Sequence, residues 1–557
     1  MIQINDLPQE ILEYILYFVS PYDDLKSCRL VCQRWYLSCL GVVKKRKSMF
    51  SQALKCGIVQ WYTPNISNQS NAITRRYSHS ACIYDSFMYI FGGCTATNTT
   101  FNDLWKFHLG TYEWTRLLTT GTYPSPKAYA SMVSWKNNLI LFGGWTHPSV
   151  YPLHQQWVLF NELHIYDILA NRWTQCHYSG SPPPTAGHTA TVHGNIVVLF
   201  GGLQKQECLS SSTNDIYCLN LENECWYKPL VSSLKPQPRY GHSQIKLDER
   251  HILVMAGCGG SNKLYSDIWL LTLPVDPSNL SSEWLWEVIN IKGLENMPSQ
   301  IWYNPACKVG DNIVILSTWK CEEQNSGASG NKMHQLLVPG NVRRQPSNIW
   351  NPNSNPNILV QEPPLQAEHN NIDNLELNIN GQRGALRSPP VREASASSSD
   401  ENSEGNPSRS RARPSIRPNA SRDRERMLQV LSRMEEKIKS HRNVGASCGE
   451  GSCSSKHKDK KIKNSHSVLV PHLLDISKAI TCKSVVWLSV AVDNEGNPPF
   501  MGIAPQPSLL YTLFMGRGHL IMFGGIPNDP IGIQNQEAVS NHVNYISAPS
   551  IPIINKS

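Results

Sequence analysis

Five short apolar runs in this chain each end in a pair of glycines, and this repetition constrains the fold more than any other feature of the sequence. The runs occupy residues 89–93, 140–144, 198–202, 254–260 and 521–525. A second phrase, in which apolar and polar residues alternate, follows the first four runs at 102–107, 161–166, 214–219 and 266–271. A tryptophan comes after each of the first three phrases, at Trp114, Trp173 and Trp226. Units that recur about every fifty residues indicate a repeat architecture.

Each repeat unit has the pattern of a small β-sheet. The apolar run is long enough for a buried strand and too short for a helix. The paired glycines suit a backbone that needs positive φ or a close approach to a neighbour, and the tryptophan can fill the space between adjacent sheets. Because a four-stranded sheet cannot bury both faces alone, several must stack around an axis. The sequence therefore predicts an all-β propeller.

The repeat phrases resemble those of the kelch family, whose units are the blades of a β-propeller. Six blades are expected. In the fifth, residues 304–317 supply the first strands, and the outer strands resume only at 473–487. The sixth spans 511–546 and lacks a fourth strand, which residues 57–62 would supply by pairing beside 541–546 and removing two exposed edges. The alternative is five blades followed by a separate C-terminal module.

A long insertion interrupts the predicted fifth blade at residues 320–466, where the composition predicts disorder. Residues 340–465 hold 21 Lys and Arg against 14 Asp and Glu, a balance of +7 within the net +8 of the whole chain, so the basic character belongs to the insertion. An apolar stripe at 424–442 suits either a docking or self-association helix or a transient one, and the transient helix is preferred. The lysine-rich segment 456–463 fits a nuclear import signal, a nucleic-acid contact or a solvated charge run.

The first forty residues are helical in pattern. Apolar residues recur there at three- and four-residue spacing, Pro8 suits the first turn of a helix that runs to about residue 19, and Ser20-Pro21 is a natural break. So short a segment is near the lower limit for an independent core. We therefore expect it to keep much of its apolar surface for a partner.

The Leu-Pro-x-Glu-Ile-Leu opening at 7–12 and the Val-Cys-x-x-Trp motif at 31–35 closely resemble an F-box. The resemblance implies docking on the Skp adaptor of a cullin-type ubiquitin ligase. It assigns the adaptor contact to Leu7, Pro8, Ile11, Leu12, Ile15 and Leu16, with Leu30, Val31 and Trp35 packing beside or contacting the adaptor. The alternative is a plain helical hairpin packed on the propeller.

The expected domains follow from these patterns. They are a small all-α F-box at 1–45, propeller blades 1 to 5 at 57–317 with 57–62 as the closing strand of the last blade, the insertion at 320–466, and the remainder of blade 5 with blade 6 at 467–549.

The sequence gives no support for export, a membrane span or a zinc site. Sixteen cysteines lie scattered without a disulfide framework, and the pairs Cys28/Cys32 and Cys448/Cys453 have no matching second pair. No apolar stretch reaches membrane-spanning length, and the first twenty residues lack the features of a secretory signal. Cytoplasm and/or nucleus are the expected locations.

Catalysis is not expected either. No Walker loop, nucleophile elbow or carboxylate pair occurs in a suitable context. His79, His188 and His242 recur at equivalent repeat positions, so we interpret them as buried structural imidazoles that bond the backbone within each blade. We expect no cofactor.

Seven residues at the ends of strands or in loops are predicted to contact a protein substrate, because loops carry binding sites and because Arg and aromatic residues dominate interface energetics. They are Arg76, Tyr77, Tyr129, Trp145, His147, Arg239 and Tyr240. For Arg76, Tyr77, Arg239 and Tyr240 the alternative is a structural role in the repeat. Trp145 and His147 break the repeat pattern and are the better candidates.

These features predict a non-catalytic substrate-recognition subunit of an SCF ubiquitin ligase. The expected partners are a Skp-type adaptor, a cullin scaffold reached through it, and a protein substrate on the propeller, without membrane or nucleic acid. The alternative is a kelch scaffold protein without a ligase role, located in the nucleus.

Overall fold

The computed structural model describes residues 4–64, 72–97, 99–146, 158–206, 209–260, 263–298, 301–320, 467–492, 500–527 and 539–549. All of them belong to one compact unit. Apart from residue 320, the predicted insertion lies outside the described residues, and so do its segments 424–442 and 456–463.

The N-terminal part of the described chain is helical. A short 3-10 helix η1 (Ile4–Asp6) precedes α1 (Gln9–Tyr17), α2 (Asp23–Cys28) and α3 (Gln33–Lys55). Helix α1 begins directly after Pro8, as the sequence predicts, because proline fits the start of a helix, where its missing N–H costs no hydrogen bond. The three helices share a small apolar core, which consists of Leu12, Leu16, Leu25, Cys39 and Val42. We call residues 4–45 the helical module.

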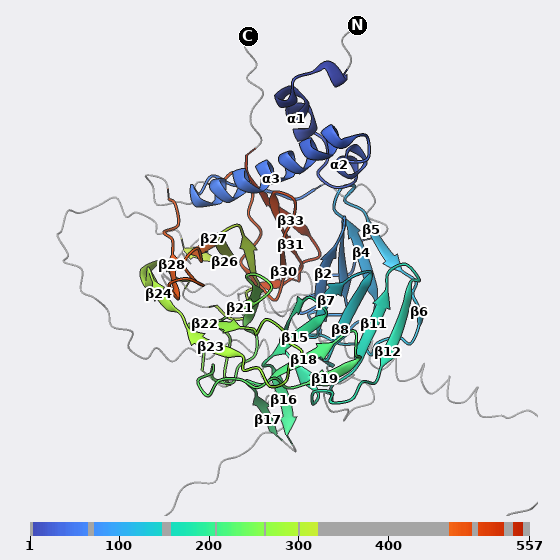
Figure 1. Cartoon of the computed structure of the whole chain (residues 1–557), viewed down its shortest axis with the longest axis vertical. Coiled ribbons are helices and arrows are strands. Elements are labelled where there is room, and N and C mark those ends of the chain that lie inside the picture. Colours follow the sequence, from blue (N-terminus) through green and yellow to red (C-terminus); the bar gives the residue numbers. More distant parts are fainter. Residues whose placement is uncertain are drawn as a thin grey trace, which may run out of the picture. The chain divides into compact units, whose positions relative to one another are not determined.

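Six sheets of four or five strands follow in the described part of the chain (Figure 1). Sheet 1 contains β2 (Ser80–Tyr84), β3 (Phe87–Phe91), β4 (Leu104–His108) and β5 (Trp114–Leu117). Sheet 2 contains β7 (Ser131–Trp135), β8 (Asn138–Phe142), β11 (Leu163–Asp167), β12 (Arg172–Cys176) and, at its edge, β6 (Thr120–Gly121). Sheet 3 contains β14 (Thr189–His193), β15 (Ile196–Phe200), β18 (Ile216–Asn220) and β19 (Cys225–Tyr227).

The remaining sheets include the two that join distant parts of the chain. Sheet 4 contains β20 (Ser243–Lys246), β21 (His251–Met255), β22 (Ile268–Thr272) and β23 (Leu285–Val288). Sheet 5 contains β25 (Ala306–Val309), β26 (Asn312–Lys320), β27 (Ser467–Asp475), β28 (Ser484–Trp487) and, at its edge, β24 (Asn290–Lys292). Sheet 6 contains β30 (Thr512–Met515), β31 (His519–Phe523), β33 (Val543–Ser547) and β1 (Gln60–Tyr62).

Shorter elements lie in the connections. The pairs are β9 (Trp145–Thr146) with β10 (Val158–Leu159), and β29 (Ser508–Leu509) with β32 (Ile526–Pro527), while β13 (Thr185–Ala186), β16 (Leu203–Gln206) and β17 (Leu209–Ser212) form a three-stranded sheet. A second 3-10 helix, η3 (Leu294–Asn296), follows β24.

Two strand pairs span large gaps in sequence. In sheet 5 the nine-residue strands β26 and β27 pair antiparallel from Asn312 opposite Asp475 to Lys320 opposite Ser467, so the insertion leaves and re-enters the fold at one point. In sheet 6 the strand expected to close the ring is β1, which pairs antiparallel with β33 and places Trp61 opposite Ile546.

Aromatic residues fill the space between neighbouring sheets, as the repeat pattern predicts. The phenylalanine before a Gly-Gly pair packs on a tryptophan of an adjacent sheet at centroid distances of 4.9 to 5.5 Å. The pairs are Phe91–Trp173, Phe142–Trp226, Phe200–Trp286 and Phe523–Trp114. Such pairs add about 0.5–1.5 kcal/mol each beyond the burial of their area.

The repeated histidines also connect neighbouring sheets. Nε2 of His79, His188 and His242 lies 3.2, 2.8 and 2.6 Å from a hydroxyl of the preceding sheet, on Thr512, Ser131 and Thr189 respectively. The prediction that these imidazoles bond the backbone within their own blade was therefore wrong. The repeat showed that the positions are equivalent, but the bonding partner lies one repeat away.

A ring of six backbone hydrogen bonds joins the segments that lead into the first strand of each sheet. Each N–H donates to the carbonyl of the corresponding residue in the preceding sheet, at 2.9 to 3.2 Å. The six residues, which we call the closing ring, are Ser78, Tyr129, Gly187, Gly241, Tyr303 and Leu510. All six have positive φ, between 54° and 66°.

Candidate functional site

Helix α1 exposes a stripe of large apolar side chains. Ile11, Tyr14, Ile15 and Phe18 follow one another at the 3, 4 and 7 spacing that places them on one face of the helix, and Tyr14 and Phe18 are 61 % and 60 % exposed. Leu12 and Leu16 are buried in the core of the helical module. Helix α1 is therefore apolar on a buried face and also on an exposed one.

A second exposed apolar group follows α2. Leu30 is 85 % exposed in the turn before α3, with Val31 beside it, and the first turns of α3 expose Tyr36, Leu37 and Leu40. Concentrated exposure of large apolar residues on a small module is typical of a protein-binding surface. We call the α1 stripe together with these five residues the apolar face.

The predicted adaptor residues divide between this face and the core. Ile11, Ile15, Leu30 and Val31 belong to the apolar face, and Pro8 is exposed as well. Leu7 and Trp35 are half-buried, while Leu12 and Leu16 support α1 from beneath. The sequence interpretation missed Tyr14, Phe18, Tyr36, Leu37 and Leu40, although the spacing of the first two relative to Ile11 was visible in the sequence.

The second half of α3 attaches the helical module to the sheets. Phe50 and Leu54 are buried in one apolar cluster with Trp61, Val314 and Leu316, which belong to sheets 5 and 6. The helix runs to Lys55 without a break, through the predicted domain boundary at residue 45. A single helix therefore belongs to both cores.

Polar contacts add to this attachment near α2. The Tyr22 hydroxyl lies 2.8 Å from Nε2 of His519, and Arg517 donates a hydrogen bond to the Pro21 carbonyl at 2.7 Å. Lys26 pairs with Asp85 of sheet 1 at 2.5 Å. Because Tyr22 is buried, its hydroxyl has a raised pKa and stays protonated as a hydrogen-bonding group.

The two predicted substrate-binding arginines are completely buried. Arg76 makes two hydrogen bonds to the carboxylate of Asp103 at 2.7 and 3.0 Å, and Arg239 does the same to Asp267 at 2.7 and 2.8 Å. Burial opposes ionisation of both carboxyls, but the hydrogen bonds and charge of the arginines outweigh it and lower the pKa of each. This geometry supports the structural alternative for Arg76 and Arg239.

The predicted aromatic residues lie in one buried cluster next to the closing ring. Tyr77, Tyr129, Trp145 and Tyr240 all belong to it, and the ring of Tyr129 lies 5.8 Å from that of Trp145. Their contact with a substrate stays a prediction. His147, the seventh predicted residue, lies outside the described residues.

Two other kinds of feature are absent from the described residues. There, no three or more His, Cys, Asp and Glu side chains gather in a way that could hold a metal ion. No helix of the described chain is both long and apolar enough to cross a membrane.

Two family models match this chain. Residues 4–42 match the F-box-like family, and residues 76–284 match the family described as FBX42, beta-propeller domain. The predicted resemblance to F-box and kelch proteins is confirmed, as is the fold class of a small helical F-box followed by a β-propeller of antiparallel sheets. A leading F-box, kelch units and a long late insertion also resemble F-box only protein 42 and its relatives, and the second family model confirms that resemblance.

Three curated proteins are similar to part of this chain, and one of them is named for a kelch domain. Tip elongation aberrant protein 1 of Schizosaccharomyces pombe is 28 % identical over 42 % of this chain and 20 % of its own length. Acyl-CoA-binding domain-containing protein 4 of Arabidopsis thaliana is 28 % identical over 38 % of this chain and 31 % of its own. Kelch domain-containing protein 1 of Mus musculus is 28 % identical over 44 % of this chain and 64 % of its own length. The chain thus spans less than two thirds of each of these relatives.

Proposed function

We propose, for a chain that joins an F-box-like domain to a propeller matching the FBX42 model, the role of substrate receptor in an SCF-type ubiquitin ligase. The F-box binds a Skp-type adaptor and reaches the cullin scaffold through it, while the propeller binds the target protein. The receptor contributes proximity rather than chemistry, because holding a target beside a ubiquitin-charged enzyme raises its effective concentration.

The observation that carries this proposal is the apolar face on a module fixed to the propeller. Ile11, Ile15 and Phe18 leave apolar area in water that a partner would bury, at about 25 cal/mol per Å². Phe50, on the same helix as the exposed Leu37, is buried against the sheets. An adaptor bound at the apolar face would therefore hold the propeller in a defined orientation, which a receptor needs in order to present a target.

Target binding is assigned to the propeller as a whole. Trp145 and His147 keep their predicted role as substrate contacts, and the location in cytoplasm and/or nucleus is part of the same proposal. Affinity capture with and without Trp145→Ala tests this part. If the captured proteins are unchanged, the predicted substrate-binding surface is elsewhere.

Co-purification tests the adaptor contact. The full chain is expressed with an affinity tag, and the bound Skp-type adaptor is quantified for the wild type, for the double variant Ile11→Glu/Ile15→Glu and for Val275→Glu. Val275 is a matched control because it is 84 % exposed and lies outside the helical module. We expect adaptor with the wild type and Val275→Glu, and its loss from the double variant.

Absence of the adaptor from the wild type would remove the ligase role and leave the kelch scaffold as the function. Equal amounts of adaptor in all three would show that the protein binds the adaptor through a different surface.

A further inference from the structure

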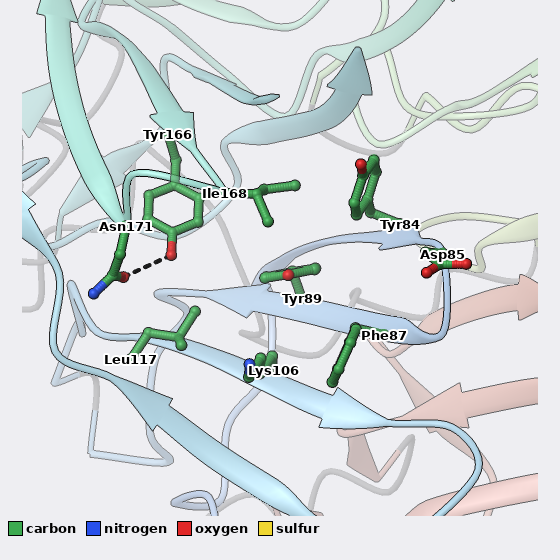
Figure 2. A pocket seen from close by; sticks show the side chains of 9 residues that line it. All are labelled: Tyr84, Asp85, Phe87, Tyr89, Lys106, Leu117, Tyr166, Ile168 and Asn171. Carbon is green, nitrogen blue, oxygen red and sulfur yellow. Dashed lines mark hydrogen bonds between the residues drawn. The ribbon is translucent and has the colours of Figure 1, made fainter. Parts of the chain in front are cut away.

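A pocket of about 310 Å³ opens between sheets 1 and 2 (Figure 2). Sheet 1 contributes Tyr84, Phe87, Tyr89 and Lys106, and sheet 2 contributes Tyr166 with Asn171 from the turn after it. Its volume is near the lower end of small-ligand sites, which is about 300 Å³. The pocket is large enough for one or two side chains and too small for a folded segment.

Two of the three tyrosine hydroxyls in the pocket already have partners. Tyr84 donates a hydrogen bond to Oδ1 of Asn137 at 2.5 Å, and Tyr166 donates to Oδ1 of Asn171 at 2.7 Å, as Figure 2 shows for the second pair. The hydroxyl of Tyr89 has no hydrogen-bond partner among the described residues, although the side chain is only 3 % exposed. Burial raises the pKa of Tyr89, so this group is a donor throughout the physiological range.

The charge available in the pocket is positive. Lys106 lies opposite Tyr89 in the pairing of β3 with β4, and its ammonium sits 4.7 Å from the centroid of Phe87. Within the described chain, no carboxylate lies within ion-pair distance of it. The one acidic residue of the lining, Asp85, already faces Lys26 at 2.5 Å and Arg517 at 3.7 Å.

These groups define the ligand chemistry. A cation and a phenolic donor on adjacent strands match a carboxylate, since charge-assisted hydrogen bonds are the strong ones. The rings of Phe87 and Tyr166 also line the pocket and supply apolar surface suited to an aromatic ring. We propose that this pocket binds an acidic peptide segment of a protein partner, with a carboxylate held by Lys106 and Tyr89 and an aromatic side chain against Phe87 and Tyr166.

The site lies beside the helical module, because Asp85 in its lining is the residue that pairs with Lys26 of α2. A segment bound here would be held close to the F-box and thus close to an adaptor. Only this consequence rests on the proposed function, since peptide binding can be measured on the chain alone.

Two capped dipeptides test the proposal by ligand-observed NMR titration of the full chain. The probes are N-acetyl-Glu-Phe-amide and N-acetyl-Gln-Phe-amide, which differ only in the charge. We expect the Glu probe to bind about tenfold more tightly than the Gln probe, as for one hydrogen bond to a charged group. Lys106→Met should remove that difference, because it keeps the aliphatic stem and loses the ammonium.

Lys136→Met is the matched control, because Lys136 is another lysine over an aromatic ring, at 4.2 Å from Trp135, and lies outside the pocket lining. It should leave the preference for Glu intact, while Tyr89→Phe should reduce it without unfolding the chain. Equal binding of the two probes by the wild type would overturn the proposal, as would an equal loss in Lys136→Met and Lys106→Met. Either result leaves the adaptor experiment unaffected.

Discussion

The backbone N–H of Ser78 donates a hydrogen bond to the carbonyl oxygen of Leu510 at 3.1 Å, which joins the first sheet to the last across more than four hundred residues. This bond completes the closing ring, whose other five members are linked in the same way. Because every donor has its acceptor inside the ring, these six N–H groups and six carbonyls satisfy one another's hydrogen bonds. The ring is therefore a shared structural element, and a change in one member should affect the whole propeller.

Gly241→Ala should destabilise the propeller more than Gly194→Ala. Both glycines have φ near 60°, so alanine costs about 1 kcal/mol of backbone strain at either position. A Cβ at Gly241 would also lie 2.8 Å from Cζ of Tyr303, whereas nothing lies within 4 Å of a Cβ at Gly194. Urea unfolding of the two variants measures the difference, and equal losses would show that Tyr303 moves aside without cost.

Arg239→Met should cost about 1.5–3 kcal/mol in the free energy of unfolding, because it removes two charge-assisted hydrogen bonds from the carboxylate of Asp267, which is partly open to water. The double variant Arg239→Met/Asp267→Asn should lose less than the single one, since no unpaired charge remains. The exposed Arg172→Met is the control. If the free energy of unfolding falls as much in the double variant as in the single one, or more, the pair does not stabilise the fold through its charges.

The stability of the propeller should fall as the pH decreases from about 6.5 to 4. Burial lowers the pKa of His188 to about 4 and that of His79 to about 3, whereas an unfolded histidine titrates near 6.5. Between these values the unfolded chain takes up protons that the folded chain does not, so the free energy of unfolding decreases with acid. Urea unfolding at pH 7.5 and 5 measures this loss. His188→Asn should make it smaller by about 1–2 kcal/mol, and an unchanged loss would contradict the assignment.

Phe50→Ala should loosen the attachment of the helical module. The Phe50 side chain is fully buried among residues of sheets 5 and 6, so its truncation costs about 3–5 kcal/mol of packing free energy. Hydrogen exchange of amides in residues 47–55 should accelerate, while Lys47→Ala, at an exposed position of the same helix, leaves it unchanged. Exchange at the wild-type rate in Phe50→Ala would mean that other contacts hold α3 in place.

The repeat pattern predicted the sheets well because most units carry their own strand, glycine or tryptophan signals. Those signals are local, and the burial of Trp173 and Trp226 between sheets follows directly from them. Hydrogen-bond partners on neighbouring sheets were harder to predict. His188 bonds to Ser131 of another sheet, and a sequence repeat cannot show whether equivalent positions meet within one unit or between two.

The sequence also does not show which side chains are buried, and this limited the prediction of binding sites. Arg76 and Tyr77 have the residue types of a binding surface, but the carboxylate that pairs with Arg76 is Asp103, in a different strand connection. On α1 the apolar pattern predicted a helix in a segment that keeps much of its apolar surface for a partner. The structure was needed to show that Leu12 points inward while Tyr14 and Phe18 face solvent.

The most direct test of the receptor function is calorimetric titration of the purified full chain with a purified Skp-type adaptor. The receptor function predicts saturable binding of one adaptor per chain, which Ile15→Glu weakens at least about tenfold because a charge would enter an apolar contact. The exposed Val275→Glu should bind like the wild type. No measurable binding by the wild type, or equal affinity for wild type and Ile15→Glu, would contradict it.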